Sequence, residues 1–270
     1  MSNSKTIHMH RDNPINYKFL FIMIIGITTF HYLVNFIQDK EASEFILYIF
    51  SIINPTITGV AALLVSFRHR SKNLGLKSNT FRRSYIILGI AFLAAAIGEV
   101  LYFTYDYILE EPAFPSPADV LFIPFYPLVL VYLYLNTSFC KPKFGLRHMW
   151  IIILPIFIII FYYVLLGKQD QDIQFYTSEY YIVVSSISLA FTVFATLIFK
   201  DSLLGKTWLL LLLGIVSFTI ADVIYYNLEA VNGYDLVHPV NLLWYVGYWI
   251  ITYALYKHPS GKKEKISHTN

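Results

Sequence analysis

Long apolar stretches alternate with short polar segments along most of the chain. Several windows of about twenty residues contain neither Lys nor Arg. A helix of that length crosses a hydrocarbon core of roughly 30 Å, because each residue adds about 1.5 Å of rise. The pattern predicts eight such helices, at residues 18–37, 44–67, 84–108, 117–136, 148–166, 178–199, 207–229 and 238–256. We therefore expect an all-α, polytopic membrane protein with eight transmembrane helices.

Two stretches, residues 98–135 and 221–256, repeat one pattern. Each holds an apolar segment with one carboxylate, a short loop that contains proline, and a second apolar segment that proline opens. The aligned pairs are Glu99 with Asp222, Tyr102 with Tyr225, Asp119 with Asn241, Phe122 with Trp244, and Tyr126 with Tyr248. Self-similarity of this kind indicates an internal repeat.

The repeat divides the chain into two halves. The matched segments are the third and fourth spans and the seventh and eighth, so we expect four spans in residues 18–137 and four in 138–257. Both halves then start on the same side of the membrane, which makes the repeat parallel, with polar tails at 1–17 and 258–270. Ligand sites of membrane proteins often lie where two repeats meet. A duplication with no site at its interface is the alternative.

Composition and charge add an orientation. Apolar residues make up 57% of the chain and charged residues only 14%, which suits a lipid-facing surface rather than a water-soluble one. Of the 20 Lys and Arg residues, all but Lys40 and Lys168 fall in the two tails and in the loops that follow even-numbered spans. Because positively charged loops stay in the cytoplasm, we predict a multi-pass plasma-membrane protein with both termini cytoplasmic.

Polar side chains inside the predicted spans are the first candidates for a site, because a charge in the membrane is costly. Glu99 and Asp222 lie at the same depth of the third and seventh spans, in the outer third of the membrane. His31 falls in a similar layer, and Asp119 and Asn241 open the fourth and eighth spans from outside. These positions predict an outward-facing polar cup. Three tyrosines close to the acids in sequence are expected to line it: Tyr102, Tyr225 and Tyr248.

Each of these residues also has a structural interpretation. The run Ser116-Pro117-Ala118-Asp119 is typical of a helix start, with Asp119 as a capping residue. Asn241 occupies a weaker copy of the same arrangement. Glu99 and Asp222 lie too deep to be caps, so their structural alternative is a hydrogen bond between helices. For His31 the alternative is simple packing.

The sequence argues against several kinds of chemistry. Cys140 is the only cysteine, so neither an intramolecular disulfide nor a thiolate cluster can form within the chain. The predicted spans hold no interior lysine for a retinal Schiff base and no clustered histidines for a metal site. Walker A and serine-hydrolase motifs are absent from the sequence. We expect membrane lipids as partners, and no nucleic acid, metal or cofactor.

The stretch PSPADVLFIPFYPLVLVYLY, preceded by Glu99 and followed by a degenerate copy, resembles a known membrane region. It is similar to the multi-pass segment that lies N-terminal to many bacterial diguanylate cyclase (GGDEF) signalling proteins, over about residues 85–256. The resemblance implies a role in sensing. With the polar cup, it leads us to expect a non-enzymatic module that binds a small or lipidic ligand. These 270 residues contain no cyclase, kinase or PAS segment, so the signal would pass to a separate protein.

A second resemblance is to the lysoplasmalogenase family, which also has eight spans, with G-D in one half and S-D in the other. The matching positions here are Gly98-Glu99 and Ala221-Asp222, with Tyr248 near that family's late tyrosine pair. The resemblance implies an intramembrane lipid hydrolase in which Glu99 and Asp222 divide the acid and base roles and hydrate a vinyl ether. A transporter, whose cavity reaches both faces, is a third alternative.

Overall fold

The computed structural model describes residues 15–68, 76–138, 150–166, 172–202, 205–231 and 233–257. Within these segments the chain forms α-helices and one π-helical turn, and it contains no strand. The elements are α1 (Tyr17–Asn35), α2 (Lys40–Arg68), α3 (Leu76–Phe103), η1 (Thr104–Ile108), α4 (Asp119–Phe122), α5 (Phe125–Thr137), α6 (Trp150–Leu166), α7 (Ile173–Phe199), α8 (Gly205–Ala230) and α9 (Val240–Tyr256). The prediction of an all-α protein is confirmed. The predicted tails, apart from residues 15–17, lie outside the described residues, as do Cys140 and Lys168.

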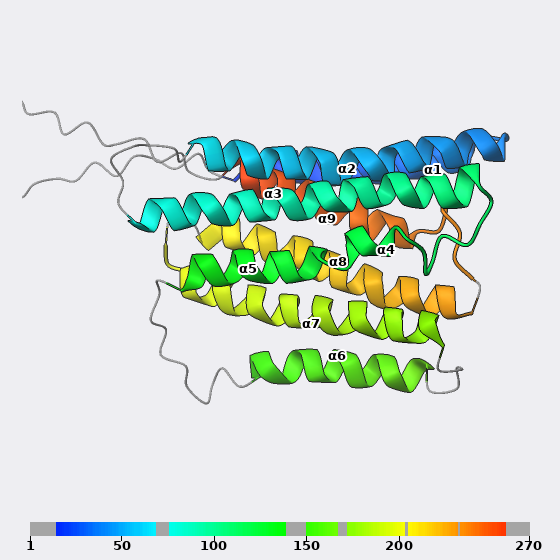
Figure 1. Ribbon diagram of the computed structural model, residues 1–270. Helices are drawn as coiled ribbons and strands as arrows, with labels where there is room; N and C mark the ends of the chain where they lie inside the picture. The colour runs from blue at the N-terminus through cyan, green and yellow to red at the C-terminus, as the bar shows by residue number, and fades with distance from the viewer. Residues whose placement is uncertain are drawn as a thin grey trace, which may run out of the picture.

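The helices run side by side in alternating directions along one bundle (Figure 1). The backbone N–H of Asn16, just before α1, donates a hydrogen bond of 2.8 Å to the hydroxyl of Tyr253 near the end of α9. The start of the first helix and the end of the last therefore lie at one end of the bundle, which we call the terminal end. The opposite end carries the connections α1–α2, η1–α4 and α8–α9, and we call it the loop end.

Within the part of the chain that the structure describes, six helical stretches are long and apolar enough to cross a membrane. They match the first, second, third, fourth, sixth and seventh predicted spans. Helices α6 and α9 stand at the places of the fifth and eighth spans and have 17 residues each. That length gives about 26 Å of helix, at the lower limit for a span. The described chain therefore has the architecture of a helical membrane protein.

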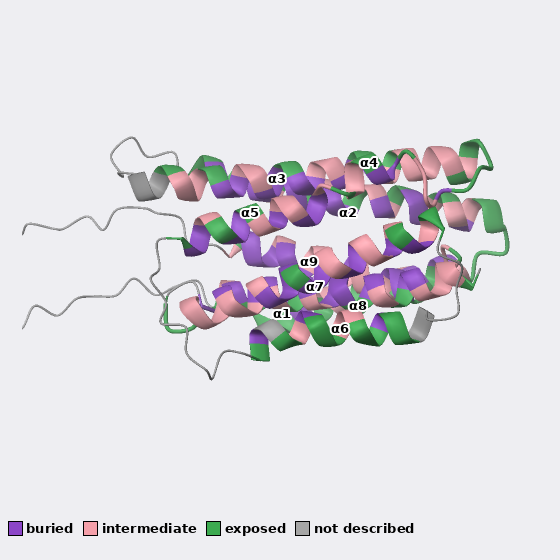
Figure 2. Cartoon of the chain, turned by 60° about the horizontal axis from the view of Figure 1, so that its bottom comes forward, coloured by how far each residue is buried: buried purple, intermediate pink, exposed green. Residues whose placement is uncertain are grey.

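Exposed residues alternate with buried ones along the helices of the bundle (Figure 2). Many of the exposed side chains are large and apolar, and the interior holds polar groups. Large apolar side chains face outward, such as Phe21, 64% exposed, and Val164, 74% exposed. Asn54, Thr58 and Ser185 are buried between helices. A water-soluble protein shows the reverse distribution, so this surface suits contact with lipid tails.

The fourth predicted span consists of two helices, α4 and α5, rather than one. Pro124 and Pro127 have no backbone N–H, so each leaves a carbonyl four residues earlier without its helical partner. The carbonyl of Ile123 instead accepts a hydrogen bond of 2.8 Å from the hydroxyl of Tyr180 in α7. The break leaves Asp119 and Phe122 of the short helix α4 facing the interior of the bundle.

Two pairs of helices approach closely at glycine. A Cβ atom on Gly247 of α9 would lie 2.5 Å from the ring of Phe218 and 3.1 Å from the carbonyl oxygen of Gly214 in α8. Gly59 of α2 and Gly89 of α3 face each other in the same way. Small residues allow such contacts between membrane helices. The pairs α2–α3 and α8–α9 are therefore held at short range.

Toward the terminal end, the interior is a packed core. It includes Tyr85 of α3, Tyr132 of α5 and Trp208 of α8. The rings of Tyr132 and Trp208 stack with their centroids 6.0 Å apart, and Tyr132 donates a hydrogen bond of 3.2 Å to Tyr85. Closer to the loop end the packing opens into a cavity.

Candidate functional site

A cavity of about 140 Å³ lies between this core and two segments of the loop end, residues 109–118 and 233–239. Helices α2, α3, α4, α5, α7, α8 and α9 contribute side chains to its wall, and Phe114 and Tyr234 come from the two segments. Of the eight residues predicted for the site, seven line this cavity: Glu99, Tyr102, Asp119, Asp222, Tyr225, Asn241 and Tyr248. The structure therefore gathers residues from both of the aligned stretches, 98–135 and 221–256, in one place.

Asp222 projects from α8 and is buried, with 5% of its surface exposed. One carboxylate oxygen accepts a hydrogen bond of 3.1 Å from the indole N–H of Trp244 in α9. The other accepts a hydrogen bond from the hydroxyl of Tyr126 in α5. Both oxygens thus have donors, and the bond from Tyr126 joins the two halves of the chain.

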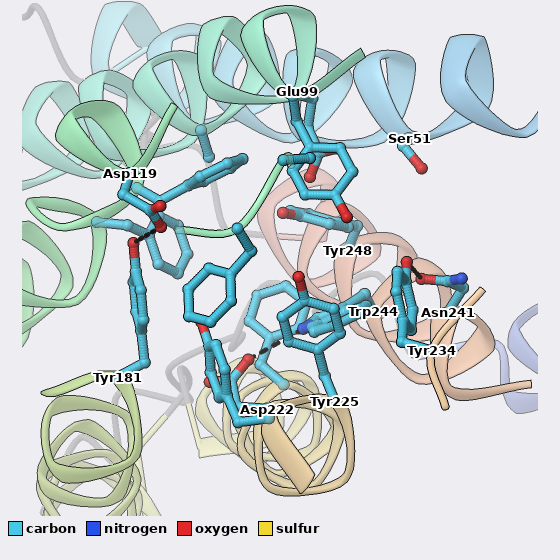
Figure 3. A pocket seen from close by; sticks show the side chains of 18 of the residues that line it. Ser51, Glu99, Asp119, Tyr181, Asp222, Tyr225, Tyr234, Asn241, Trp244 and Tyr248 are labelled. Atoms are coloured by element: carbon cyan, nitrogen blue, oxygen red, sulfur yellow. Dashed lines mark hydrogen bonds between the residues drawn. The ribbon is translucent and has the colours of Figure 1, made fainter. Parts of the chain in front are cut away.

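Glu99 reaches into the cavity from α3, on the wall opposite Asp222 (Figure 3). Among the described residues, none donates a hydrogen bond to its carboxyl group. Phe122 occupies the position that aligns with Trp244, and a phenyl ring has no N–H to donate. The two aligned acids therefore differ: the carboxyl group of Asp222 is fully engaged and that of Glu99 faces the cavity without a donor.

Tyr248 stands between the two acids. It lines the cavity and lies near enough to both Glu99 and Asp222 to interact with their charges (Figure 3). Its ring packs against Phe92 of α3 and Phe218 of α8, with centroids 5.9 and 4.8 Å away. A single aromatic side chain, packed on both sides, thus lies close to both carboxyl groups.

Asp119 and Asn241 carry structural hydrogen bonds in addition to facing the cavity. Asp119 accepts a bond of 2.8 Å from the backbone N–H of Ser116, as in a capping box, and one of 2.7 Å from the hydroxyl of Tyr181 in α7. Asn241 donates 2.7 Å to the carbonyl of Leu236 and accepts from Tyr234 at 3.2 Å. Asn241 therefore ties the segment 233–239 to the start of α9, and Tyr234 and Leu236 of that segment line the cavity.

His31 lies outside the cavity wall. It is fully buried in α1, and its Nε2 is 3.1 Å from the carbonyl oxygen of Val237 in the α8–α9 connection. Its ring meets Tyr245, which does line the cavity, edge-on at 6.0 Å between centroids. This position matches the packing interpretation of His31.

Several lining residues were not among those predicted. Ser51 of α2 and Tyr181 of α7 come from spans outside the repeated stretches, and no motif marks them. Trp244 could have been found, because it aligns with Phe122 and carries a donor that phenylalanine lacks. Tyr245 also lines the cavity and is hydrogen-bonded to Ser51 at 2.9 Å.

The wall is aromatic and acidic. Thirteen of the 21 lining residues are aromatic, three carry carboxyl groups, and the described wall contains no Lys, Arg or His. The aromatic members are Tyr102, Phe114, Phe122, Phe125, Tyr126, Tyr181, Phe218, Tyr225, Tyr226, Tyr234, Trp244, Tyr245 and Tyr248. Within the described residues, no group of three His, Cys, Asp or Glu side chains is placed to hold a metal ion.

Comparisons with known proteins find no matching family model, curated protein or solved structure.

Proposed function

We propose that this protein is a plasma-membrane ligand-binding module that senses a small or lipidic molecule in the cavity around Glu99 and passes the signal to a separate protein. In this proposal the chain crosses the membrane eight times, α6 and α9 included. The eight helices form a parallel repeat of four plus four, and both termini are cytoplasmic. The cavity lies at the interface of the two repeats.

The single observation that carries the proposal is the carboxyl group of Glu99. Glu99 is half-buried, and its carboxyl group meets the cavity instead of a protein donor. A polar group taken out of water without a hydrogen-bond partner costs roughly 1–3 kcal/mol, and more when it is charged. Asp222, at the aligned position, shows that this fold can supply two donors to a carboxylate. Glu99 has no such donors among the described residues, and a bound ligand that donates to its carboxyl group explains this best.

The distribution of charge supports an outward-facing cavity. Acidic side chains gather at the loop end, where the cavity lies, and Lys40 is the one Lys or Arg among the described residues there. Lys and Arg gather at the terminal end: Lys18, Arg68, Arg82, Arg83, Lys200, Lys206 and Lys257. Under the positive-inside rule the terminal end is cytoplasmic, so the cavity lies toward the external face.

An intramembrane hydrolase is the alternative that one observation favours: both carboxyl groups line the same cavity in unlike surroundings. Glu99 would protonate the β-carbon of a vinyl ether, and Asp222 would take a proton from the water that adds to the neighbouring carbon. The hemiacetal so formed would break down to an aldehyde and an alcohol. However, both oxygens of Asp222 already accept hydrogen bonds, which leaves it poorly placed to act as a base.

A transporter needs a cavity that can reach both faces of the membrane. Here the core around Tyr85, Tyr132 and Trp208 fills the bundle between the cavity and the terminal end. The arrangement thus favours a protein that binds a ligand over one that transports it across the membrane.

The test is ligand-induced thermal stabilisation of the purified full-length protein, screened against soluble metabolites and lysolipids. We expect at least one compound to raise the unfolding temperature of the wild type and of Glu111→Gln, an exposed loop control. The same compound should leave Glu99→Gln unchanged. If every stabilising compound acts equally on Glu99→Gln, the proposal is wrong. Turnover of a vinyl-ether lysolipid that Asp222→Asn abolishes would establish the hydrolase instead.

A further inference from the structure

The cavity has an unbalanced charge. Three carboxyl side chains line it, and the described wall offers no cationic side chain to pair with them. Asp119 and Asp222 each accept two hydrogen bonds from protein donors, whereas Glu99 has none within the described chain. A carboxylate in a low-dielectric interior needs a counter-charge as well as hydrogen bonds. The missing partner is therefore expected to be positively charged.

We infer that the cavity binds a small organic cation, an amine or a quaternary ammonium group, with Glu99 as its counter-ion. This inference rests on the proposed function, because it names the class of ligand for the same cavity. It explains why the wall contains acids and aromatic rings together.

Aromatic rings are the second observation. A cation over the face of Trp, Tyr or Phe is attracted by the ring, by about 0.5–2 kcal/mol for each contact, and cages of such rings recognise alkylated ammonium groups. Tyr102, Tyr225, Trp244 and Tyr248 all line the same cavity as Glu99. Figure 3 shows the last three of these rings. The rings of Tyr225 and Trp244 are fixed edge-to-face with centroids 5.2 Å apart. Such a wall also favours the apolar carbons of an organic cation.

An inorganic cation fits this wall less well. Calcium takes six to eight oxygen ligands, and magnesium requires a nearly octahedral set. The described residues provide no group of three acidic, histidine or cysteine side chains arranged to hold a metal. Most of the wall is aromatic carbon, which cannot replace the hydration shell of a metal ion.

The size of the cavity agrees with a small ligand. A single water needs roughly 10–15 Å³ of cavity space, so about 140 Å³ has room for a group of on the order of ten non-hydrogen atoms. A trimethylammonium group with a short polar chain is of that size. The ligand can be a free amine or the cationic headgroup of a lipid, which present the same chemistry to Glu99.

Charge around the cavity favours the approach of a cation. Asp106 in η1 accepts a hydrogen bond from Tyr48 of α2, and Glu229 near the end of α8 interacts with Tyr225 of the wall. Further acids stand at the loop end: Asp39, Glu41, Glu110, Glu111, Asp172 and Asp235. A surface of one sign concentrates ions of the opposite sign and speeds their association.

The test compares choline with 3,3-dimethylbutan-1-ol, a neutral molecule of nearly the same shape. Binding to the full-length protein in phosphatidylglycerol nanodiscs is followed by calorimetry and tryptophan fluorescence. We expect choline to bind the wild type and Glu111→Gln at least about 10-fold more tightly than the neutral analogue, and Glu99→Gln to lose that preference. Tyr248→Leu should weaken choline binding, and Tyr248→Phe should retain it. A second arm replaces half of the lipid with phosphatidylcholine and adds no free choline.

The outcomes separate this inference from the proposed function. Stabilisation by phosphatidylcholine alone, dependent on Glu99, supports the inference with a lipid headgroup as the ligand. Equal binding of choline and its neutral analogue overturns the cation but keeps a ligand-binding cavity. If neither compound binds and neutral compounds stabilise the protein through Glu99, the cation is again wrong and the proposed function stands. If no compound of any class acts through Glu99, both are wrong.

Discussion

The indole N–H of Trp244 donates a hydrogen bond of 3.1 Å to the carboxylate of Asp222. At the aligned position of the first copy stands Phe122, whose ring lies against Gly98, next to the aligned acid Glu99. One substitution between the copies thus removes a donor from one of two acids. The two aligned positions therefore hold one carboxylate with two donors and one with none among the described residues.

This difference predicts that two matched substitutions change the free energy of unfolding by different amounts. In Asp222→Asn the new amide has one acceptor oxygen in place of two, so either the O–H of Tyr126 or the N–H of Trp244 loses its acceptor, at a cost of about 1–2 kcal/mol. Glu99→Gln removes no hydrogen bond to a described residue, so the free energy of unfolding should stay within about 0.5 kcal/mol of the wild type. Thermal unfolding in detergent measures both. Equal destabilisation by the two variants would contradict the assignment.

The bond between Tyr126 and Asp222 joins the two halves of the chain. Tyr126→Phe removes the hydroxyl and leaves one carboxylate oxygen of Asp222 without its donor, so we expect a loss of about 1–2 kcal/mol. Tyr134→Phe is the matched control, because Tyr134 lies in the same helix, α5, and is 62% exposed. The midpoint of thermal unfolding should fall for the first variant and hold for the second.

The close approach of α8 and α9 makes Gly247 sensitive to any side chain. A methyl group there would meet the ring of Phe218 at 2.5 Å, so Gly247→Ala should cost about 1–3 kcal/mol through overpacking. Gly26 of α1 has open space around the same position, and alanine favours helix over glycine. Gly26→Ala should therefore be neutral or slightly stabilising. Folded yield and unfolding temperature report both, and a neutral Gly247→Ala would refute the contact.

The proposed orientation is tested with the native cysteine. Cys140 falls in a segment that we expect in the cytoplasm, so a membrane-impermeant maleimide should leave it unlabelled in intact cells and label it after lysis. In a Cys140→Ser background, Asp235→Cys at the loop end should react in intact cells. The opposite labelling pattern would show that the chain has the reverse orientation in the membrane.

Much of the fold could be predicted from the sequence, because apolar length and basic loops are strong local signals. The six long apolar helices begin and end within a few residues of the predicted spans, with the largest differences at the starts of α3 and α7. At α7 the reason is Asp172, whose side chain accepts a hydrogen bond of 2.8 Å from the backbone N–H of Phe175 and so starts the helix earlier than apolarity alone suggests. The break between α4 and α5 was not predicted, because the carbonyl of Ile123 is satisfied by Tyr180 of a distant helix, α7.

Part of the cavity wall could also be predicted, because some of its residues leave a local signal in the sequence. The repeat pointed to Glu99 and Asp222, since aligned polar residues in apolar segments are visible in one dimension. It could not show that His31 turns to the carbonyl of Val237, or that Tyr181 joins the wall. Those contacts depend on how α1 and α7 pack, and no local pattern encodes that packing.

The most direct test is to map the reaction of the two aligned acids with a hydrophobic carbodiimide, which modifies carboxyl groups that a small molecule can reach within a membrane protein. After treatment of the full-length protein in nanodiscs, mass spectrometry compares the peptides that contain Glu99 and Asp222. We predict an adduct on Glu99, protected by excess choline, with little or none on Asp222, whose oxygens are engaged by Tyr126 and Trp244. Equal modification of both acids, or an unmodified Glu99, would contradict a ligand cavity built around Glu99.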